Sequence, residues 1–285
     1  MLRAKWGQTR LVNVYEFERK RQGFMSKIDR EAAKKIFGEY TDRYNSADPK
    51  IKLKVDHTYR VADLCERIGK SIGLAGIELD IAWMCGLLHD IGRFEQIRRY
   101  GTFSDADSID HASLSTMILF GENDTDSGMI RQFLADSRWD EMIRNAVRWH
   151  SSYRIPDGLD EKTAMYCNIL RDADKIDILR VNLDTPMEDI YNVSTEELRF
   201  SQVTPEVMQA FDEHHAVVRA LKKTAVDYPV GHISLVYELV YPVSRQIVKE
   251  QGYLTKLMDF QTENAVKKQQ FAHIREEMGH FLEQE

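Results

Sequence analysis

The chain has few cysteines, few prolines and no long run of apolar residues. Its 285 residues include three cysteines and six prolines. Cys65, Cys85 and Cys167 lack C-x-x-C spacing and lie within apolar helical patterns. They are therefore predicted to be reduced thiols that pack as small hydrophobes in a cytoplasmic protein. The longest apolar runs fall far short of the roughly 20 residues that a membrane-spanning helix needs.

The overall charge also limits the function. The formal net charge is −7, which argues against nonspecific binding to nucleic acid or anionic membranes. Hydrophobic residues make up 43% and charged residues 30% of the chain, as in ordinary soluble globular proteins. The first 24 residues hold no apolar core of signal-peptide length, so export is not expected. Residues 1–28 are predicted to be an N-terminal extension, and Met25 is a candidate for the true start.

The periodicity of the apolar residues predicts an all-α protein. Apolar residues recur with a period near 3.6, and no alternating run is long enough to support a sheet. Polar or glycine-containing breaks separate the segments. The expected helices are 29–46, 56–74, 77–91, 109–120, 139–150, 161–179, 206–226, 232–250 and 261–283.

The most informative motif is the pair His89-Asp90 after an apolar stretch. Adjacent imidazole and carboxylate groups at the end of an apolar helix suit a divalent cation, which binds both at about 2.0–2.2 Å. Gly92 is predicted to end this helix. The pair would then lie in the last turn, where the negative end of the helix dipole favours a cation.

Two further candidate ligands lie far from this pair in the sequence. His57 precedes it and Asp174 follows it, each in a helical pattern. Such residues on separate helices can converge on one ion that keeps open positions for water or substrate. Asp172 and Asp177 compete with Asp174 for the same role, and Asp172 lies on a different face of the helix.

This ordered set resembles the HD-domain metal-dependent phosphohydrolases with an HDIG-type motif, over about residues 52–180. The resemblance implies an HD-domain helical bundle over 29–184, with 185–285 as additional C-terminal helices packed on the HD core. The family pattern of a small residue, Asp, Lys and an aliphatic residue selects Asp174 as the ligand. Asp177 is then expected to cap a helix or pair with a neighbour.

The resemblance extends to a second metal. His111 and His150 stand where family members with two metals carry extra histidines. By analogy Asp90 bridges the ions, with His57, His89 and Asp174 on the first and His111 and His150 on the second. The expected cofactor is one or two divalent ions of Mn, Fe, Co, Ni, Zn or Mg. The other histidines are interpreted as structural or solvent-facing: His214, His215, His232, His273 and His280.

The implied activity is hydrolysis of a phosphomonoester or phosphodiester of a small metabolite, most plausibly a nucleotide, by a metal-activated water. Asp90 is expected to help orient this water. Arg93 is the first candidate for neutralising charge on the phosphoryl oxygens, and Lys175 is the second. The segment Tyr100–Asp110 is predicted to be a loop near the mouth of the site. Other cations that flank the ligands are Arg60, Arg98, Arg99, Arg148 and Arg154.

Departures from the family pattern leave alternatives open. Arg93 replaces a lysine and Ser151 replaces a histidine of the subfamily that cleaves cyclic di-guanylate, so that activity is not implied. Deoxynucleotidases of the family carry a glutamate after the HD pair, and Glu95 is the nearest one here. A non-catalytic nucleotide-sensing module that binds metal, and a di-iron oxygenase, are the other interpretations. The chain is also a possible homo-oligomer.

Overall fold

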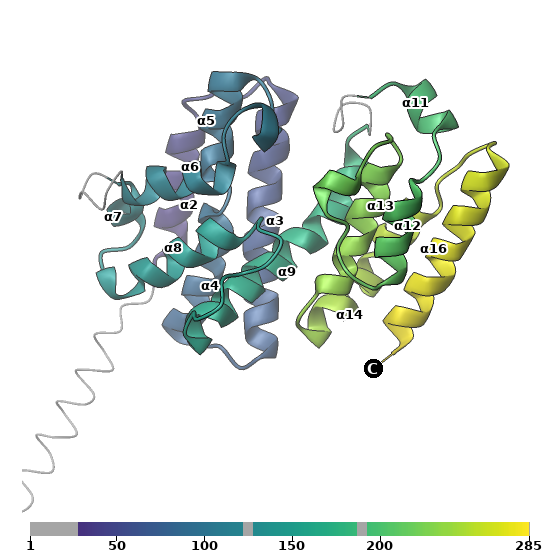
Figure 1. The fold of residues 1–285 in the computed structure, drawn as a ribbon. Helices are drawn as coiled ribbons and strands as arrows, with labels where there is room; N and C mark the ends of the chain where they lie inside the picture. Colours follow the sequence, from purple (N-terminus) through teal and green to yellow (C-terminus); the bar gives the residue numbers. More distant parts are fainter. Residues whose placement is uncertain (1–27, 122–127, 187–192, 285) are drawn as a thin grey trace, which may run out of the picture.

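The computed structural model describes residues 28–121, 128–186 and 193–284. Within these ranges the chain is helical and contains no strand, which confirms the predicted all-α fold (Figure 1). None of the described helices is long and apolar enough to span a membrane. Most of the predicted extension, including the candidate start Met25, lies outside the described residues.

The N-terminal half of the molecule is a bundle built around the apolar helix α4 (Figure 1). Ten of the thirteen residues of α4 are buried, because α3, α8 and α9 pack around it. The first half consists of α2 (Arg30–Thr41), α3 (Pro49–Ser71), α4 (Gly76–Leu88), α5 (Ile91–Tyr100), η1 (Asp105–Asp107), α6 (His111–Phe120), α7 (Ile130–Phe133), η3 (Ser137–Trp139), α8 (Asp140–Trp149) and α9 (Glu161–Asp184).

Side-chain caps and a close backbone contact fix the two longest helices of this half. Asp48 caps α3 by accepting a hydrogen bond from the Lys50 amide, and Asp160 caps α9. Gly86 lets α4 approach α3, because a Cβ atom there would lie 2.5 Å from the Cα of Ala62. This contact places the C-terminal end of α4 against the middle of α3.

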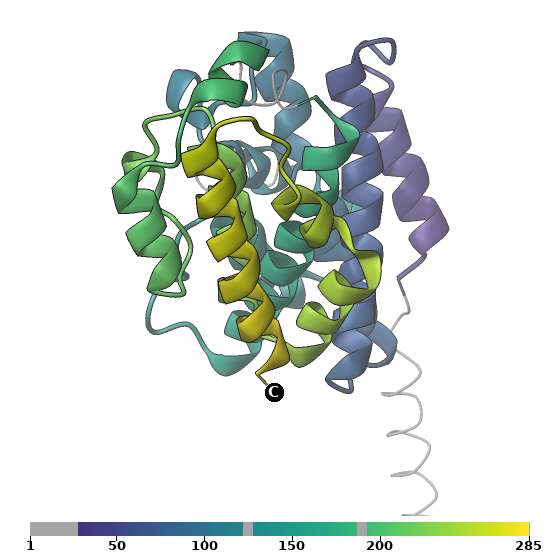
Figure 2. The same cartoon turned by 90° about the vertical axis from the view of Figure 1, so that its right-hand side faces the viewer.

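The C-terminal half packs on the long helix α9, which runs from one half of the molecule into the other (Figure 1). Helices α13, α14 and α15 and the turn η5 contact α9, and α14 also contacts α3. Helix α16 runs along the outside of this half (Figure 2). The elements are α11 (Thr195–Phe200), α12 (Pro205–Asp212), η4 (Arg219–Leu221), α13 (Asp227–Ile233), η5 (Ser234–Glu238), α14 (Pro242–Gln251), α15 (Tyr253–Met258) and α16 (Ala265–Glu283).

Two helices expected in this half are broken in the structure. The predicted helix 206–226 ends at Asp212, and the chain then turns at His214, whose φ of 57° is left-handed. The predicted helix 232–250 is divided into the end of α13, a 3₁₀ turn and α14. Pro242 stands in the first turn of α14, where it lacks only an amide that would have no helical partner.

Candidate metal centre

The His89-Asp90 pair lies at a two-residue junction between helices. His89 follows the last residue of α4 and Asp90 precedes the first residue of α5. The prediction that Gly92 ends the helix is wrong, because Gly92 lies in the first turn of α5. A Cβ atom on Gly92 would lie 2.6 Å from the Ser115 amide nitrogen and 2.8 Å from the His111 carbonyl oxygen. The glycine therefore allows α5 to approach the start of α6 and places His111 beside Asp90.

A first group of ligand-type side chains surrounds one carboxylate oxygen of Asp90. Its Oδ2 lies 3.6 Å from His57 Nε2 and 3.5 Å from His89 Nε2. The two imidazole Nε2 atoms lie 3.3 Å apart. Asp174 Oδ1 completes the group at 3.2 Å from His57 Nε2 and 3.9 Å from His89 Nε2. Helices α3, α4 and α9 thus bring these four residues together.

A second group surrounds the other oxygen of the same carboxylate. Asp90 Oδ1 lies 3.5 Å from His111 Nε2 and 3.7 Å from His150 Nε2. These two Nε2 atoms are 3.0 Å apart. Asp90 Oδ1 is buried and accepts no hydrogen bond from the described residues. The two groups, His57-His89-Asp90 and Asp90-His111-His150, each have the geometry to hold a metal ion, and Asp90 belongs to both.

The hydrogen bonds of the four rings fix which nitrogen faces the centre. Each Nδ1 lies 2.6 or 2.7 Å from an oxygen that can only accept: carboxylates for His57 and His111, and backbone carbonyls for His89 and His150. Each Nδ1 therefore carries the proton, and in the neutral rings each Nε2 presents a lone pair. Lone pairs of two nitrogens 3.0 Å apart repel unless a cation lies near both. The donor set therefore fits divalent metal ions, and carboxylate or carbonyl partners on Nδ1 are typical of histidine ligands.

The electrostatics of the centre favour positive charge. Burial would raise the pKa of Asp90, but Lys54 and His89 outweigh it and hold this pKa well below its usual range. Burial and Lys54 act to lower the pKa of His57, yet its hydrogen bonds to Asp174 and Asp177 raise it overall. Burial and Arg93 lower the pKa of His111 to about 4. The carboxylates thus stay ionised, and they attract a proton or a metal ion to the same place.

The structure adds three residues that the sequence reasoning did not assign to the centre. Lys54 Nζ donates to Asp90 Oδ2 at 2.7 Å. Asp177 and Asp105 accept from the Nδ1 atoms of His57 and His111, each at 2.6 Å. Lys54 precedes His57 by three residues on one helix, and that spacing is the signal that could have identified it. Asp105 carries no such signal, because its loop has no periodicity.

Arg93 lies beside the centre, and most of its contacts are with the loop 101–110. Its Nη1 donates to the Phe103 carbonyl at 2.7 Å and to Asp105 Oδ1 at 3.0 Å. Its Nε is buried, has no hydrogen-bond acceptor in the described part of the chain, and lies 3.6 Å from Asp90 Oδ1. The Phe103 ring lies between two cations, with Lys54 Nζ 5.4 Å and the Arg93 guanidinium carbon 5.7 Å from its centroid. One cation thus lies next to each oxygen of Asp90.

Lys175, the second candidate cation, lies on the side of α9 that faces η5. Its Nζ donates to the Glu238 carbonyl at 3.3 Å, and burial and then Arg171 lower its pKa to about 8. Neighbouring Asp172 is fully buried and accepts from the amides of Val240 and Tyr241. Asp172 thus anchors the C-terminal half, while Asp174 faces the centre.

Several charged residues near the predicted ligands form ion pairs with one another or with Asp177, and within the described ranges they do not contact the ligand atoms of the metal centre. Arg60 donates to Asp177, as expected for an aspartate that pairs with a neighbour. Glu95 accepts from Arg98 and Arg99, and no described contact links it to the metal centre. These three arginines, which are among the cations that flank the predicted ligands, pair with carboxylates in the structure.

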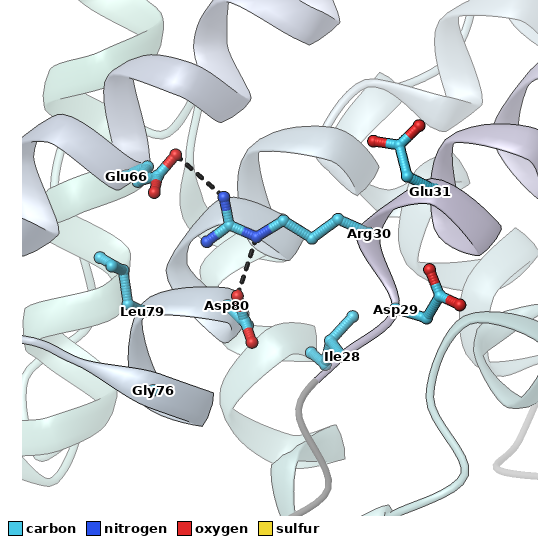
Figure 3. Close-up of a pocket in the computed structure, with 8 residues that line it drawn as sticks. All are labelled: Ile28, Asp29, Arg30, Glu31, Glu66, Gly76, Leu79 and Asp80. Atoms are coloured by element: carbon cyan, nitrogen blue, oxygen red, sulfur yellow. Dashed lines mark hydrogen bonds and ion pairs between the residues drawn. The ribbon is translucent and has the colours of Figure 1, made fainter.

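A separate cavity lies away from this centre (Figure 3). It has a volume of about 840 Å³ and is lined by the starts of α2 and α4 and by part of α3. Arg30 crosses it and joins these helices, with Nε 2.8 Å from Asp80 Oδ1 and Nη1 2.9 Å from Glu66 Oε2 (Figure 3). None of its lining residues belongs to the two ligand groups.

Comparison with protein families identifies the region that carries the centre. Residues 55–179 match the family model described as HD domain. The matched range contains all six predicted ligands and ends within α9. Comparisons with curated proteins and with solved structures gave no match. Residues 55–179 are therefore an HD domain, as the sequence resemblance implied.

Proposed function

We propose that this protein is a metal-dependent phosphohydrolase that cleaves a phosphate ester of a small metabolite, with a nucleotide as the preferred candidate, in the cytoplasm. One observation carries the proposal. The Nε2 atoms of His57 and His89 lie close together, as do those of His111 and His150. One carboxylate oxygen of Asp90 lies beside each of these two histidine pairs. Sites with two ions that share a carboxylate suit displacement at phosphorus, because both the attacking and the leaving oxygen can be stabilised.

The residues present could hold two ions. His57, His89, Asp90 and Asp174 form the first set, and Asp90, His111 and His150 form the second. Imidazole and carboxylate ligands suit Mn, Fe, Co, Ni and Zn, and Mg less well. A bound divalent ion lowers the pKa of a coordinated water and polarises a phosphoryl oxygen.

The protein's own side chains supply orientation and charge. Asp177 and Asp105 hold the rings of His57 and His111 so that Nε2 faces inward. Lys54 and Arg93 lie next to Asp90, where they can neutralise charge on a phosphoryl group. Lys175 remains the second candidate from the sequence, and its Nζ donates to the Glu238 carbonyl on the side of α9 that faces η5. Asp90 can also accept a hydrogen bond from the attacking water.

The test starts from metal content. We would purify the protein without chelator or nickel affinity, measure its metals by elemental analysis, and assay phosphomonoesters and phosphodiesters with Mn²⁺ or Fe²⁺. We expect turnover that chelation abolishes and that Asp90→Asn reduces at least a hundredfold. Tight nucleotide binding without turnover would contradict the proposal in favour of a sensing module. A requirement for reduced iron and dioxygen would contradict it in favour of an oxygenase.

A further inference from the structure

The 3₁₀ turn η4 of the C-terminal half contacts the loop 101–110 beside the metal centre. Arg219 Nη2 donates to Ser104 Oγ at 3.2 Å. Ser104 stands between Phe103, whose ring lies against Lys54 and Arg93, and Asp105, which bonds His111. A cationic residue from sequence far outside the HD domain therefore touches the loop next to the metal centre.

A second connection runs along α9. His232 Nδ1 lies 2.9 Å from Asn182 Oδ1, and Asn182 is two turns after Asp174 on the same helix. Burial, followed by Lys222, lowers the pKa of His232 to about 3, while Asp174 acts in the opposite direction. His232 thus lies within electrostatic range of both Lys222 and a residue of the metal centre. His232 and Asn182 therefore connect the C-terminal half with the helix that carries Asp174.

Lys222 is a half-buried cation that has no acceptor among the described residues. Among the described residues no hydrogen bond or ion pair reaches its ammonium group, which lies 5.6 Å from the centroid of the Tyr228 ring. Its stem crosses Gly231, where an added Cβ would collide with the end of the side chain. Burial, and then the neighbouring charge of Arg219, lower its pKa to about 8.

Asp227, the carboxylate whose charge acts on Lys222, does not pair with it. Asp227 is fully buried, and its two oxygens accept four hydrogen bonds, two from Thr204 and one each from the amides of Lys223 and Thr224. Partial burial of a charge without a partner is costly, and a bound anion would offset that cost. Lys222 and Arg219 lie three residues apart and together leave a surplus of positive charge, and Arg219 contacts Ser104 of the HD domain.

We propose that Lys222, assisted by Arg219, forms a second anion-binding subsite that receives a phosphate remote from the one that reacts. This rests on the proposed function for the reacting phosphate, which the metal centre would hold. The preferred substrate class is then a small metabolite with two separated phosphate groups. The C-terminal half gives the enzyme its substrate preference, and the HD domain provides the chemistry.

The test compares a substrate with one phosphate and a substrate with two. The probes are p-nitrophenyl phosphate, adenosine 5′-monophosphate and adenosine 3′,5′-bisphosphate, assayed on the metal-loaded protein. We expect Lys222→Met to raise KM for the bisphosphate about tenfold, as loss of a charged hydrogen bond would, with kcat within about twofold. Kinetics with p-nitrophenyl phosphate should stay unchanged. Lys222→Arg should retain the bisphosphate preference, because it keeps the charge.

Lys223→Met is the matched control. Lys223 is adjacent and loses the same charge, but its Nζ bonds Glu206 at 2.6 Å on the surface, so its variant should behave as wild type. The subsite proposal is overturned if Lys222→Met affects both kinds of substrate equally, or neither. Binding affinities measured by calorimetry test the subsite proposal separately from the proposed hydrolase activity. If the protein hydrolyses no ester but binds the bisphosphate more tightly than the monophosphate, and Lys222→Met removes this difference, the subsite stands and the hydrolase proposal fails.

Discussion

The Nε2 atoms of His111 and His150 lie 3.0 Å apart, and each ring donates its Nδ1 proton to an oxygen on its other side. Two neutral imidazoles cannot hydrogen-bond to each other through two lone pairs. The same relationship holds for His57 and His89 at 3.3 Å. Because the arrangement occurs twice around one aspartate, it can be tested one ion at a time.

Removing one ring of the second pair should remove one ion. We expect His150→Ala to lower the metal content by about one ion per chain relative to wild type, since the remaining His111 and Asp90 supply too few ligands. Elemental analysis after gel filtration measures this. His273→Ala is the control, because His273 is exposed and pairs with Asp212. An unchanged metal content in His150→Ala would show that the second group holds no ion.

Lys54 should weaken metal binding while it assists turnover. Its ammonium group lies 2.7 Å from the Asp90 oxygen that faces the first group, so it competes electrostatically with an ion there. We expect Lys54→Met to bind Mn²⁺ severalfold more tightly but to lose about tenfold or more in kcat/KM. Metal titration and steady-state kinetics give the two readouts. Lys52→Met, at an exposed lysine paired with Asp56, should change neither. Parallel losses of metal binding and activity would rule out this role.

Asp177 should act through His57. It accepts from His57 Nδ1 and pairs with Arg60, so Asp177→Asn leaves the ring poorly oriented and less basic. We expect metal affinity to fall about 10-fold to 100-fold, the usual effect of losing a carboxylate behind a histidine ligand. Competition with a chelating dye measures it. Asp184→Asn, at the exposed end of the same helix, should retain the wild-type affinity.

Gly92 should tolerate no side chain. An alanine Cβ would overlap the backbone of His111 and Ser115, so α5 or α6 must move. We expect Gly92→Ala to lower the free energy of unfolding by about 1–3 kcal/mol, measured in urea. Gly279→Ala in α16 is the control, because its Cβ would meet open space and should be neutral or stabilising by up to about 1 kcal/mol. Equal stabilities of the two variants would refute the close approach.

Glu95 should contribute stability that is lost in acid. Its hydrogen bonds with Arg98, opposed by burial and assisted by Arg99, lower its pKa to about 2 from the ordinary 4.5. The folded form therefore binds this proton more weakly than the unfolded form. The contribution is complete above about pH 4.5 and disappears as the pH falls towards 2. We expect about 1 kcal/mol, because both arginines are more than half exposed and therefore screened. Urea unfolding of wild type and Glu95→Gln should differ at pH 7 and converge as the pH falls to about 2.

The sequence predicted well those features that depend on local periodicity. The apolar stripes around His57 and before His89 predicted helices, and α3 and α4 are found there. The sequence-based prediction failed where one backbone dihedral angle determines whether a helix ends. At His214 the chain adopts a left-handed φ of 57°, and the apolar residues that continue after it suggested one long helix.

The metal-ligand candidates could be predicted from the sequence, whereas some of the residues that position them could not. His57, Asp90 and Asp174 could be chosen from motif and order, and the structure brings them together. Asp105 could not, because a loop-to-helix contact leaves no repeat in the sequence. Gly92 was interpreted as a helix end, whereas the structure needs it for a close approach between α5 and α6. Sequence alone cannot separate these two uses of glycine, since both depend on the missing Cβ.

Helix α9 carries Asp174 at the metal centre and, eight residues later, Asn182 against His232. At 1.5 Å per residue these positions are about 12 Å apart along the axis. Because α9 is continuous and contains no hinge between these two positions, their spacing does not change when side chains move. A ligand that contacts both halves of the molecule must therefore match this fixed spacing. Its length, as well as its charge, would determine whether it binds.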